Sequence, residues 1–184
     1  NKVVITGAPG TGKTSIIRFL ESNGYNCFHE FSRTLIKSGQ FNGSRNLFLD
    51  EPNSFSEKIL ETRISHFNQS NKIKNPKNNL IFFDRSIYDT FAYQKFINKS
   101  FIYPIKYKKF KYQKVFILSP WNDIYVNDNE RSESFEISKE IDRSIKLTYN
   151  HYNYKLNEIS KTSVENRVNQ ILNLCLWKKL RIFY

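Results

Sequence analysis

The chain reads Val3-Val4-Ile5-Thr6-Gly7-Ala8-Pro9-Gly10-Thr11-Gly12-Lys13-Thr14 close to its start. The first four residues are mostly β-branched and apolar and predict a strand. The rest has the form G-x-x-x-x-G-K-[ST], in which glycines let backbone N–H groups turn toward phosphate oxygens. Residues 15–21 then show the apolar spacing of a helix. Strand, loop and helix in this order predict a phosphate-binding loop, and therefore a nucleoside triphosphate as ligand.

The loop also predicts how the triphosphate is held. Lys13 can reach the β and γ phosphates, Thr14 can offer its hydroxyl to Mg²⁺, and the positive end of the following helix adds to both. The absence of an N-K-x-D guanine motif favours ATP over GTP. We therefore expect ATP and Mg²⁺ to bind here, with contacts from Pro9, Gly10, Thr11, Gly12, Lys13, Thr14 and Ser15.

Length and composition narrow the class of protein. A chain of 184 residues fits one α/β domain over residues 1–184. The net charge of +12 would suit nucleic acid or acidic lipid, but it is spread along the chain, so we favour compositional bias as its cause. Two distant cysteines and the lack of a signal peptide or of a bilayer-length apolar run predict a cytoplasmic protein that is not transmembrane.

Strand-like and helical segments alternate along the chain, which indicates a parallel sheet with helices on both faces. The predicted strands are Lys2–Thr6, Tyr25–His29, Asn79–Phe83, Lys114–Leu118 and Lys155–Ile159. The predicted helices are Lys13–Asn23, Ser32–Ser38, Ser54–Lys74, Ser86–Asn98, Ile102–Tyr112, Ser134–Tyr152 and Thr162–Lys178.

The third predicted strand ends in Asp84 and is followed at once by Arg85. An aspartate at the end of an apolar strand can hold the water shell of Mg²⁺ opposite Thr14. Ligands of open α/β sheets bind at the carboxyl ends of strands, where a guanidinium can clamp a substrate or a phosphate, so we favour a functional role for Arg85 over a surface ion pair. For Ser86 and Asp89 we favour a helix cap.

Glu30 follows the second predicted strand and should project from the same edge of the sheet. A carboxylate there can take the proton from an attacking hydroxyl. Arg33, three residues later, would share its face if a helix has begun. On the residues alone, an equally good interpretation is a glutamate that stabilises the first turn of a helix.

Three further segments carry weaker signals. Trp121 to Ser134 suits a lid over the triphosphate, with Arg131 neutralising charge during transfer, and an exposed loop is the less favoured alternative. Arg143 is a second candidate for that role, and Arg63 is a weak candidate for an acceptor pocket. Lys106–Lys114 interleaves cations and aromatics, for which we favour an amphipathic helix over a nucleic-acid or lipid patch.

Together these motifs resemble predicted P-loop ATPases of the AAA-like domain family that includes the ribosylnicotinamide kinase domain. The most specific stretch is V-F-x-L-x-P-W-x-x-I-Y-x-x-D-x-E-R over Val115–Arg131, because a phosphate loop occurs in many families. The resemblance extends over nearly the whole chain. Its other matches are G-x-P-G-x-G-K-T, Glu30 with Arg33, Asp84 with Arg85, and Ser163–Val168.

This resemblance implies a three-layer α/β sandwich whose parallel five-stranded sheet has the order 2-3-1-4-5, with the Asp84 strand beside the phosphate-loop strand. Related nucleoside kinases use a glutamate after the second strand as base and an acid-Arg-Ser step after the third, which is similar to Glu30 and Asp84-Arg85-Ser86 here. Other relatives are nucleotide-binding proteins thought to act as regulators.

The leading hypothesis is a Mg²⁺-dependent kinase that transfers phosphate from ATP to a hydroxyl of a small nucleoside-like acceptor. The alternative is a nucleotide-dependent switch or slow ATPase or GTPase that binds a macromolecule or acidic lipid through Lys106–Lys114. In the leading hypothesis the catalytic and acceptor-binding residues are Lys13, Glu30, Arg33, Asp84, Arg85 and Arg131, with Thr14 and Asp84 as metal ligands.

Overall fold

The structure, a computed structural model, describes residues 1–31, 52–125 and 134–176. Its centre is a parallel sheet of five strands in the order β2-β3-β1-β4-β5, as the family resemblance implied. The three inner strands are almost wholly buried, which explains their continuous apolar sequences. The strands are β1 (Lys2–Thr6), β2 (Asn26–Phe28), β3 (Ile81–Asp84), β4 (Lys114–Ile117) and β5 (Leu156–Glu158).

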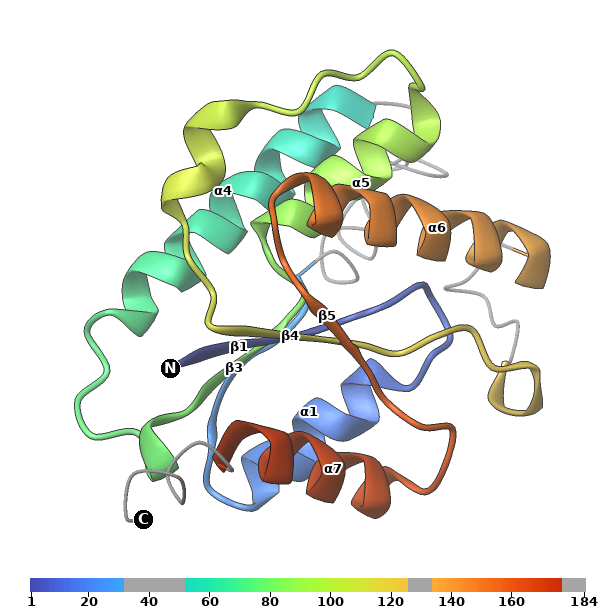
Figure 1. Cartoon of the computed structure of the whole chain (residues 1–184). Helices are drawn as coiled ribbons and strands as arrows, with labels where there is room; N and C mark the ends of the chain where they lie inside the picture. The colour runs from blue at the N-terminus through green and yellow to red at the C-terminus, as the bar shows by residue number, and fades with distance from the viewer. Residues whose placement is uncertain (32–51, 126–133, 177–184) are drawn as a thin grey trace, which may run out of the picture.

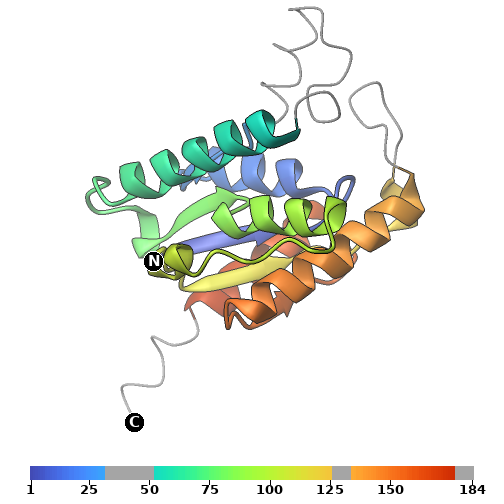
Figure 2. The same cartoon turned by 90° about the horizontal axis from the view of Figure 1, so that it is seen from above.

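Helices cover both faces of the sheet and complete the predicted three-layer sandwich (Figure 1). One face carries α1 (Lys13–Ser22) and α7 (Val164–Leu176), which pack against each other. The other face carries α4 (Pro52–Ser70), α5 (Ile87–Ile97) and α6 (Phe135–His151), which Figure 2 shows crossing the sheet. Short 3-10 turns are η1 (Lys77–Asn79), η2 (Ile105–Lys109) and η3 (Asn122–Ile124).

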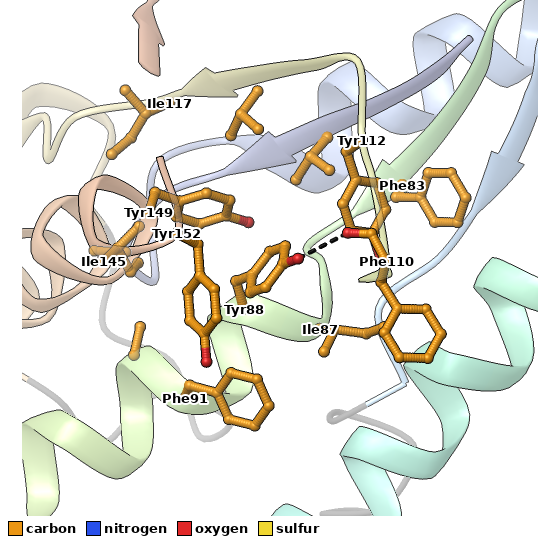
Figure 3. Close-up of a cluster of buried hydrophobic side chains, with 14 of the residues drawn as sticks. Phe83, Ile87, Tyr88, Phe91, Phe110, Tyr112, Ile117, Ile145, Tyr149 and Tyr152 are labelled. Carbon is orange, nitrogen blue, oxygen red and sulfur yellow. Dashed lines mark hydrogen bonds between the residues drawn. The ribbon is translucent and has the colours of Figure 1, made fainter. Parts of the chain in front are cut away.

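Two apolar cores lie on the two faces of the sheet. Side chains of a strand point alternately to either face, so Val3 and Ile5 belong to the core under α1 and α7, and Val4 belongs to the core under α4, α5 and α6. The second core is rich in aromatic rings (Figure 3). Its labelled residues are Phe83, Ile87, Tyr88, Phe91, Phe110, Tyr112, Ile117, Ile145, Tyr149 and Tyr152.

The predicted helix over Ile102–Tyr112 is wrong, because only the short 3-10 turn η2 forms there. This turn begins after Pro104. Two backbone carbonyls of the segment, those of Tyr107 and Phe110, accept hydrogen bonds from the buried Tyr88 hydroxyl at 3.0 and 2.7 Å. Phe110 and Tyr112 are buried, so the aromatic residues at the end of this segment serve the core as expected. The predicted helix over Ser32–Ser38 lies outside the described residues.

The strand register brings the functional segments to one edge of the sheet. Ile5 of β1 pairs with Asp84 of β3, so the phosphate loop that follows β1 lies beside the residues that follow β3. Parallel pairing of β2 with β3 brings the segment after β2 to the same edge. Among the described residues, no helix combines the length and the apolar character needed to cross a bilayer.

Candidate active site

The phosphate loop, residues 7–14, turns between β1 and α1 in the way its glycines predicted. Gly10 and Gly12 have φ of +79° and +85°, a region that residues with a side chain rarely adopt. α1 begins at Lys13 without a hydrogen bond from a capping side chain, so its first N–H groups can receive an anion. Ser15 is exposed on the first turn, and Thr14 is half-buried.

The Lys13 side chain lies over the loop and is only 5% exposed. Its ammonium donates to the Ala8 carbonyl at 2.7 Å and lies 3.3 Å from the Thr11 hydroxyl. Burial lowers the pKa of Lys13 to about 7, and the Arg85 charge adds to this shift while nearby carboxylates oppose it. Phosphate oxygens would favour the charged form, so this ammonium is placed to bind a triphosphate.

Two side chains cover the phosphate loop: Arg167, to which the sequence analysis assigned no role, and Tyr125, which belongs to the segment predicted as a lid. Arg167 of α7 donates to the Thr11 carbonyl at 3.2 Å, and a Cβ on Gly12 would lie 2.8 Å from its guanidinium. A Cβ on Gly10 would lie 2.6 Å from the Tyr125 ring. Gly10 is therefore needed for close packing against the ring as well as for backbone shape, whereas at Gly12 the end of the Arg167 side chain could move aside. Arg167 belongs to the stretch Ser163–Val168, the one signal in the sequence that could have found it.

Asp84 closes β3 next to the phosphate loop, where the sequence predicted a metal-binding carboxylate. It is 5% exposed, and its Oδ1 atom has no hydrogen-bond partner among the described residues. Burial raises the pKa of Asp84 to about 6, Glu30 adds to the shift, and Lys13 and Arg85 oppose it. A buried carboxylate oxygen with no partner beside a phosphate loop fits Mg²⁺ and its water shell.

Glu30 and Arg85 meet across the ends of β2 and β3. Arg85 Nε donates to Glu30 Oε1 at 2.6 Å, and the guanidinium is 4% exposed. Burial tends to lower the pKa of Arg85, but the charges of Glu30, Asp89 and Asp84 and the Tyr93 hydroxyl together outweigh it, and the pKa lies well above its ordinary value. Arg85 has φ of +72°, so the chain turns sharply between β3 and α5 and brings this side chain back over the strand ends.

Asp89, expected only as a helix cap, does more than cap α5. The capping box with Ser86 is present, and Ser86 N–H donates to Asp89 Oδ2 at 2.8 Å. The same carboxylate lies 3.5 Å from Arg85 Nη1, and it accepts hydrogen bonds from Tyr149 at 2.6 Å and from Thr6. Arg85 is therefore held by two carboxylates, Asp89 at the start of α5 and Glu30 after β2.

A pocket opens between the ends of β2 and β3 and the side of α4, and we call it the acceptor pocket. It combines charged groups at the strand ends with apolar and aromatic walls, and Arg63, a weak candidate from the sequence, is one of its lining residues. Its free volume is about 10 Å³, close to that of one water molecule. It is lined by His29, Glu30, Phe31, Ile59, Thr62, Arg63, His66, Phe83, Asp84, Arg85 and Tyr112.

Several predicted site residues cannot be placed. Arg33, Arg131 and residues 126–133 of the predicted lid lie outside the described residues. The described start of that segment forms η3, and Trp121 lies 5.8 Å from the Arg167 guanidinium. Arg143 is exposed on α6. Roles in a lid or in charge neutralisation therefore stay predictions for this segment.

Solved structures of several kinases share this fold. The deoxyadenosine kinase from M. mycoides with bound dATP is 16% identical, with a TM-score of 0.61 over 95% of this chain and 99% of that chain. The thymidylate kinase from Candida albicans is 14% identical, with a TM-score of 0.66 over 97% and 92%. The shikimate kinase from Acinetobacter baumannii in complex with shikimate is 16% identical, with a TM-score of 0.58 over 98% and 95%.

At 14–16% sequence identity the similarity to these kinases shows a common fold and no more. Membership of a family is shown by comparison of the sequence with family profiles. No curated protein sequence matches this chain. A family profile described as AAA domain matches residues 2–167, a range that begins in β1, contains the phosphate loop, Glu30 and the Asp84-Arg85 step, and reaches Arg167. Because this range is most of the chain, the protein belongs to the AAA domain family.

Proposed function

We propose that this protein is a Mg²⁺-dependent kinase that transfers the γ-phosphoryl group of ATP to a hydroxyl of a small nucleoside-like acceptor. The observation that carries the proposal is the buried contact between Glu30 and Arg85, which faces a pocket beside the phosphate loop. A phosphate loop by itself would also serve a nucleotide hydrolase. A carboxylate paired with a guanidinium can in addition accept the proton of an acceptor hydroxyl and bind the phosphoryl group transferred to it. The kinase fold of the solved neighbours supports the same conclusion.

The phosphate loop would hold the donor. The triphosphate would lie on backbone N–H groups of the loop and of the first turn of α1. Lys13 would exchange the Ala8 carbonyl for β and γ phosphate oxygens, which are stronger partners for its charge. Mg²⁺, held by Thr14 and Asp84, would neutralise charge on the same phosphates when bound.

Glu30 and Arg85 would act on the acceptor. Glu30 takes the proton as the acceptor oxygen forms a bond to the γ phosphorus, and the bond from that phosphorus to the β–γ bridging oxygen breaks to release ADP. Arg85 orients the acceptor and spreads the charge that develops. Because the pocket is narrow, the acceptor enters only if side chains such as Glu30 and Arg85 move apart. Arg33 is proposed to bind the acceptor, and Arg131 is proposed to neutralise charge on the phosphates of ATP during transfer.

The test measures ADP formation with Mg-ATP against a panel of acceptors: adenosine, cytidine, uridine, thymidine, nicotinamide riboside and shikimate. Glu30→Gln should lower acceptor-dependent turnover by about 10²–10⁴-fold, because it removes the proton acceptor and keeps the shape. Glu57→Gln, an exposed substitution on α4, is the matched control and should leave turnover unchanged. Equal turnover in wild type and Glu30→Gln would contradict the role of Glu30.

A second candidate function is a nucleotide-dependent regulator that binds a polyanion. It has one structural observation in its favour, a wide hollow of about 430 Å³ at the amino-terminal ends of β4 and β5. No Asp or Glu is among its described lining residues, which include Lys108, Lys111, Lys114 and Lys155. We call it the basic hollow. Slow ATP hydrolysis that no acceptor on the panel stimulates would favour this candidate over the kinase.

We also place the protein in the cytoplasm. Cys27 and Cys175 are both free thiols, which suits a reducing compartment. ATP and Mg²⁺, the ligands proposed here, are those of cytoplasmic small-molecule kinases.

A further inference from the structure

The inner wall of the acceptor pocket is not used by the proposed phosphoryl transfer. It is formed by Tyr112, from the segment before β4, and Phe83 of β3, whose ring centroids are 5.4 Å apart. The Phe67 ring of α4, which is not a lining residue, lies 5.3 Å from that of Tyr112. Figure 3 shows Tyr112 beside Phe83 within the aromatic core. Tyr112 lines the pocket and is 5% exposed.

The Tyr112 hydroxyl differs from its buried neighbours because its proton has no acceptor among the described residues, although the backbone N–H of Ile87 acts on its oxygen. Tyr88, whose ring lies 6.1 Å from that of Tyr112, donates to the carbonyls of Tyr107 and Phe110. Tyr149 donates to Asp89 at 2.6 Å. A buried hydroxyl proton without an acceptor destabilises a protein, so such groups are rare unless an ordered water or a ligand satisfies them.

The surroundings of this hydroxyl indicate what such a ligand would carry. Burial raises the pKa of Tyr112, so the hydroxyl keeps its proton and can donate it. The Arg63 charge acts on the same hydroxyl, and Arg63 Nη1 donates to Thr90 at 2.8 Å, so a second donor stands on this side of the pocket. Two donors suit an oxygen or nitrogen that accepts hydrogen bonds.

The walls indicate the shape of the ligand. Phe83 stacks on Phe28 with ring centroids 5.0 Å apart, and His66 lies 5.0 Å from the same Phe28 ring. Phe83 and His66 line the pocket together with Ile59 of α4. Aromatic and apolar walls of this kind suit a flat ring.

We propose that Tyr112 selects acceptors with a planar ring by donating a hydrogen bond to a ring carbonyl oxygen or ring nitrogen. The reacting hydroxyl of the same molecule lies at Glu30 and Arg85. This inference rests on the proposed function, because it assigns the inner end of the same pocket. Tyr112 is thus a specificity residue that does not touch the reacting atoms.

The experiment compares Tyr112→Phe with Tyr88→Phe, two substitutions that each remove one buried hydroxyl from the same aromatic core. Tyr112→Phe should not lower the Tm of the ligand-free protein, because no described residue accepts a hydrogen bond from its hydroxyl. Tyr88→Phe should lower the Tm by about 2–4 °C, because it breaks hydrogen bonds that are made.

Kinetics with the nucleosides of the panel complete the comparison. Tyr112→Phe should raise KM for the accepted nucleoside about 3- to 10-fold with little change in kcat, because one hydrogen bond far from the reacting atoms is lost. Neither substitution should change KM for D-ribose, which has no ring base. Tyr88→Phe should leave KM for the nucleoside unchanged.

The outcomes separate this inference from the proposed function. If the wild type phosphorylates a nucleoside and Tyr112→Phe has the same KM, the inference is overturned and the kinase stands. If no acceptor is phosphorylated, the proposed function fails, and the Tm shift caused by the same nucleosides decides the inference. Equal Tm shifts in wild type and Tyr112→Phe, or no shift in either, overturn it.

Discussion

The phosphate loop and the acceptor pocket lie at the same edge of the sheet but are built in opposite ways. The loop is one run of consecutive residues whose shape follows from its own glycines. The pocket takes its lining from the residues after β2, the end of β3, α4 and the segment before β4, which are up to about eighty positions apart. A continuous motif therefore predicts the nucleotide site, whereas the proposed acceptor site is formed by residues that only the fold brings together.

The largest expected effect follows from removing the charge of the loop. Lys13→Ala should lower turnover by at least about 10²–10³-fold and weaken ATP binding, because it removes the cation that stabilises the transferring phosphate. The fold should persist, since the hydrogen bonds of this side chain are with residues of the loop itself. Lys139→Ala, which removes an exposed lysine from α6, is the control. Undiminished turnover in Lys13→Ala, measured as ADP release, would break the assignment of the loop to catalysis.

A smaller effect on Mg-ATP binding should come from a change in pH, through Asp84, which lies between the phosphate loop and the acceptor pocket. The pKa of Asp84 is raised to about 6, so metal binding at lower pH must displace a proton. Affinity for Mg-ATP should therefore fall about tenfold per pH unit below pH 6. Titration calorimetry from pH 5 to 8 measures this slope, and Asp84→Asn is expected to abolish it.

The same raised pKa has a consequence for stability, with the sign fixed by linkage. An acid whose pKa is higher in the folded state favours folding below its unfolded pKa, and this contribution is lost as pH rises through about 6. Asp84→Asn should therefore have a higher Tm than the wild type above pH 6 and an equal Tm near pH 4. A gain that is the same at both pH values would argue against a buried, titrating carboxylate.

The smallest effect on turnover should come from the basic hollow, which lies at the amino-terminal ends of β4 and β5 and, among the described residues, shares only Tyr112 with the lining of the acceptor pocket. Charge reversal in Lys111→Glu with Lys155→Glu should change kcat/KM for the acceptor less than about twofold, because neither side chain lines the acceptor pocket. Binding of a single-stranded oligonucleotide at low salt should weaken if the hollow takes polyanions. Loss of turnover together with binding would mean that the two ends of the sheet are coupled.

The sequence predicted the order of strands and helices and most of their positions. Parallel strands buried on both faces must be continuous apolar runs, and the runs ending at Thr6 and Asp84 stood out for that reason. The segment before β4 was predicted as a helix, but the spacing of its aromatic residues reflects their packing in the core. Its backbone carbonyls accept hydrogen bonds from the Tyr88 hydroxyl. Local periodicity does not record such a contact.

The site residues also divide into those that local sequence patterns predict and those that only the tertiary structure reveals. The sequence alone determined Lys13, Thr14 and Asp84 as candidates, because glycine spacing and a strand that ends in an acid are local patterns with a direct chemical reason. The residues alone left Glu30 balanced between a base and a glutamate that stabilises the first turn of a helix, and the family resemblance then favoured the base. The tertiary structure showed that Glu30 meets Arg85, that Asp89 also holds Arg85, and that Arg167 packs on the loop.

Tyr112 is the clearest case of what only the tertiary structure decided. In sequence it is one aromatic residue of a basic segment, with no pattern to distinguish it from Tyr107 or Phe110. Its role depends on which hydroxyl proton in the folded core lacks an acceptor, and hydrogen bonds between distant segments settle that. Backbone shape and phosphate binding are local and can be read from the chain, whereas burial and pairing exist only once the chain has folded.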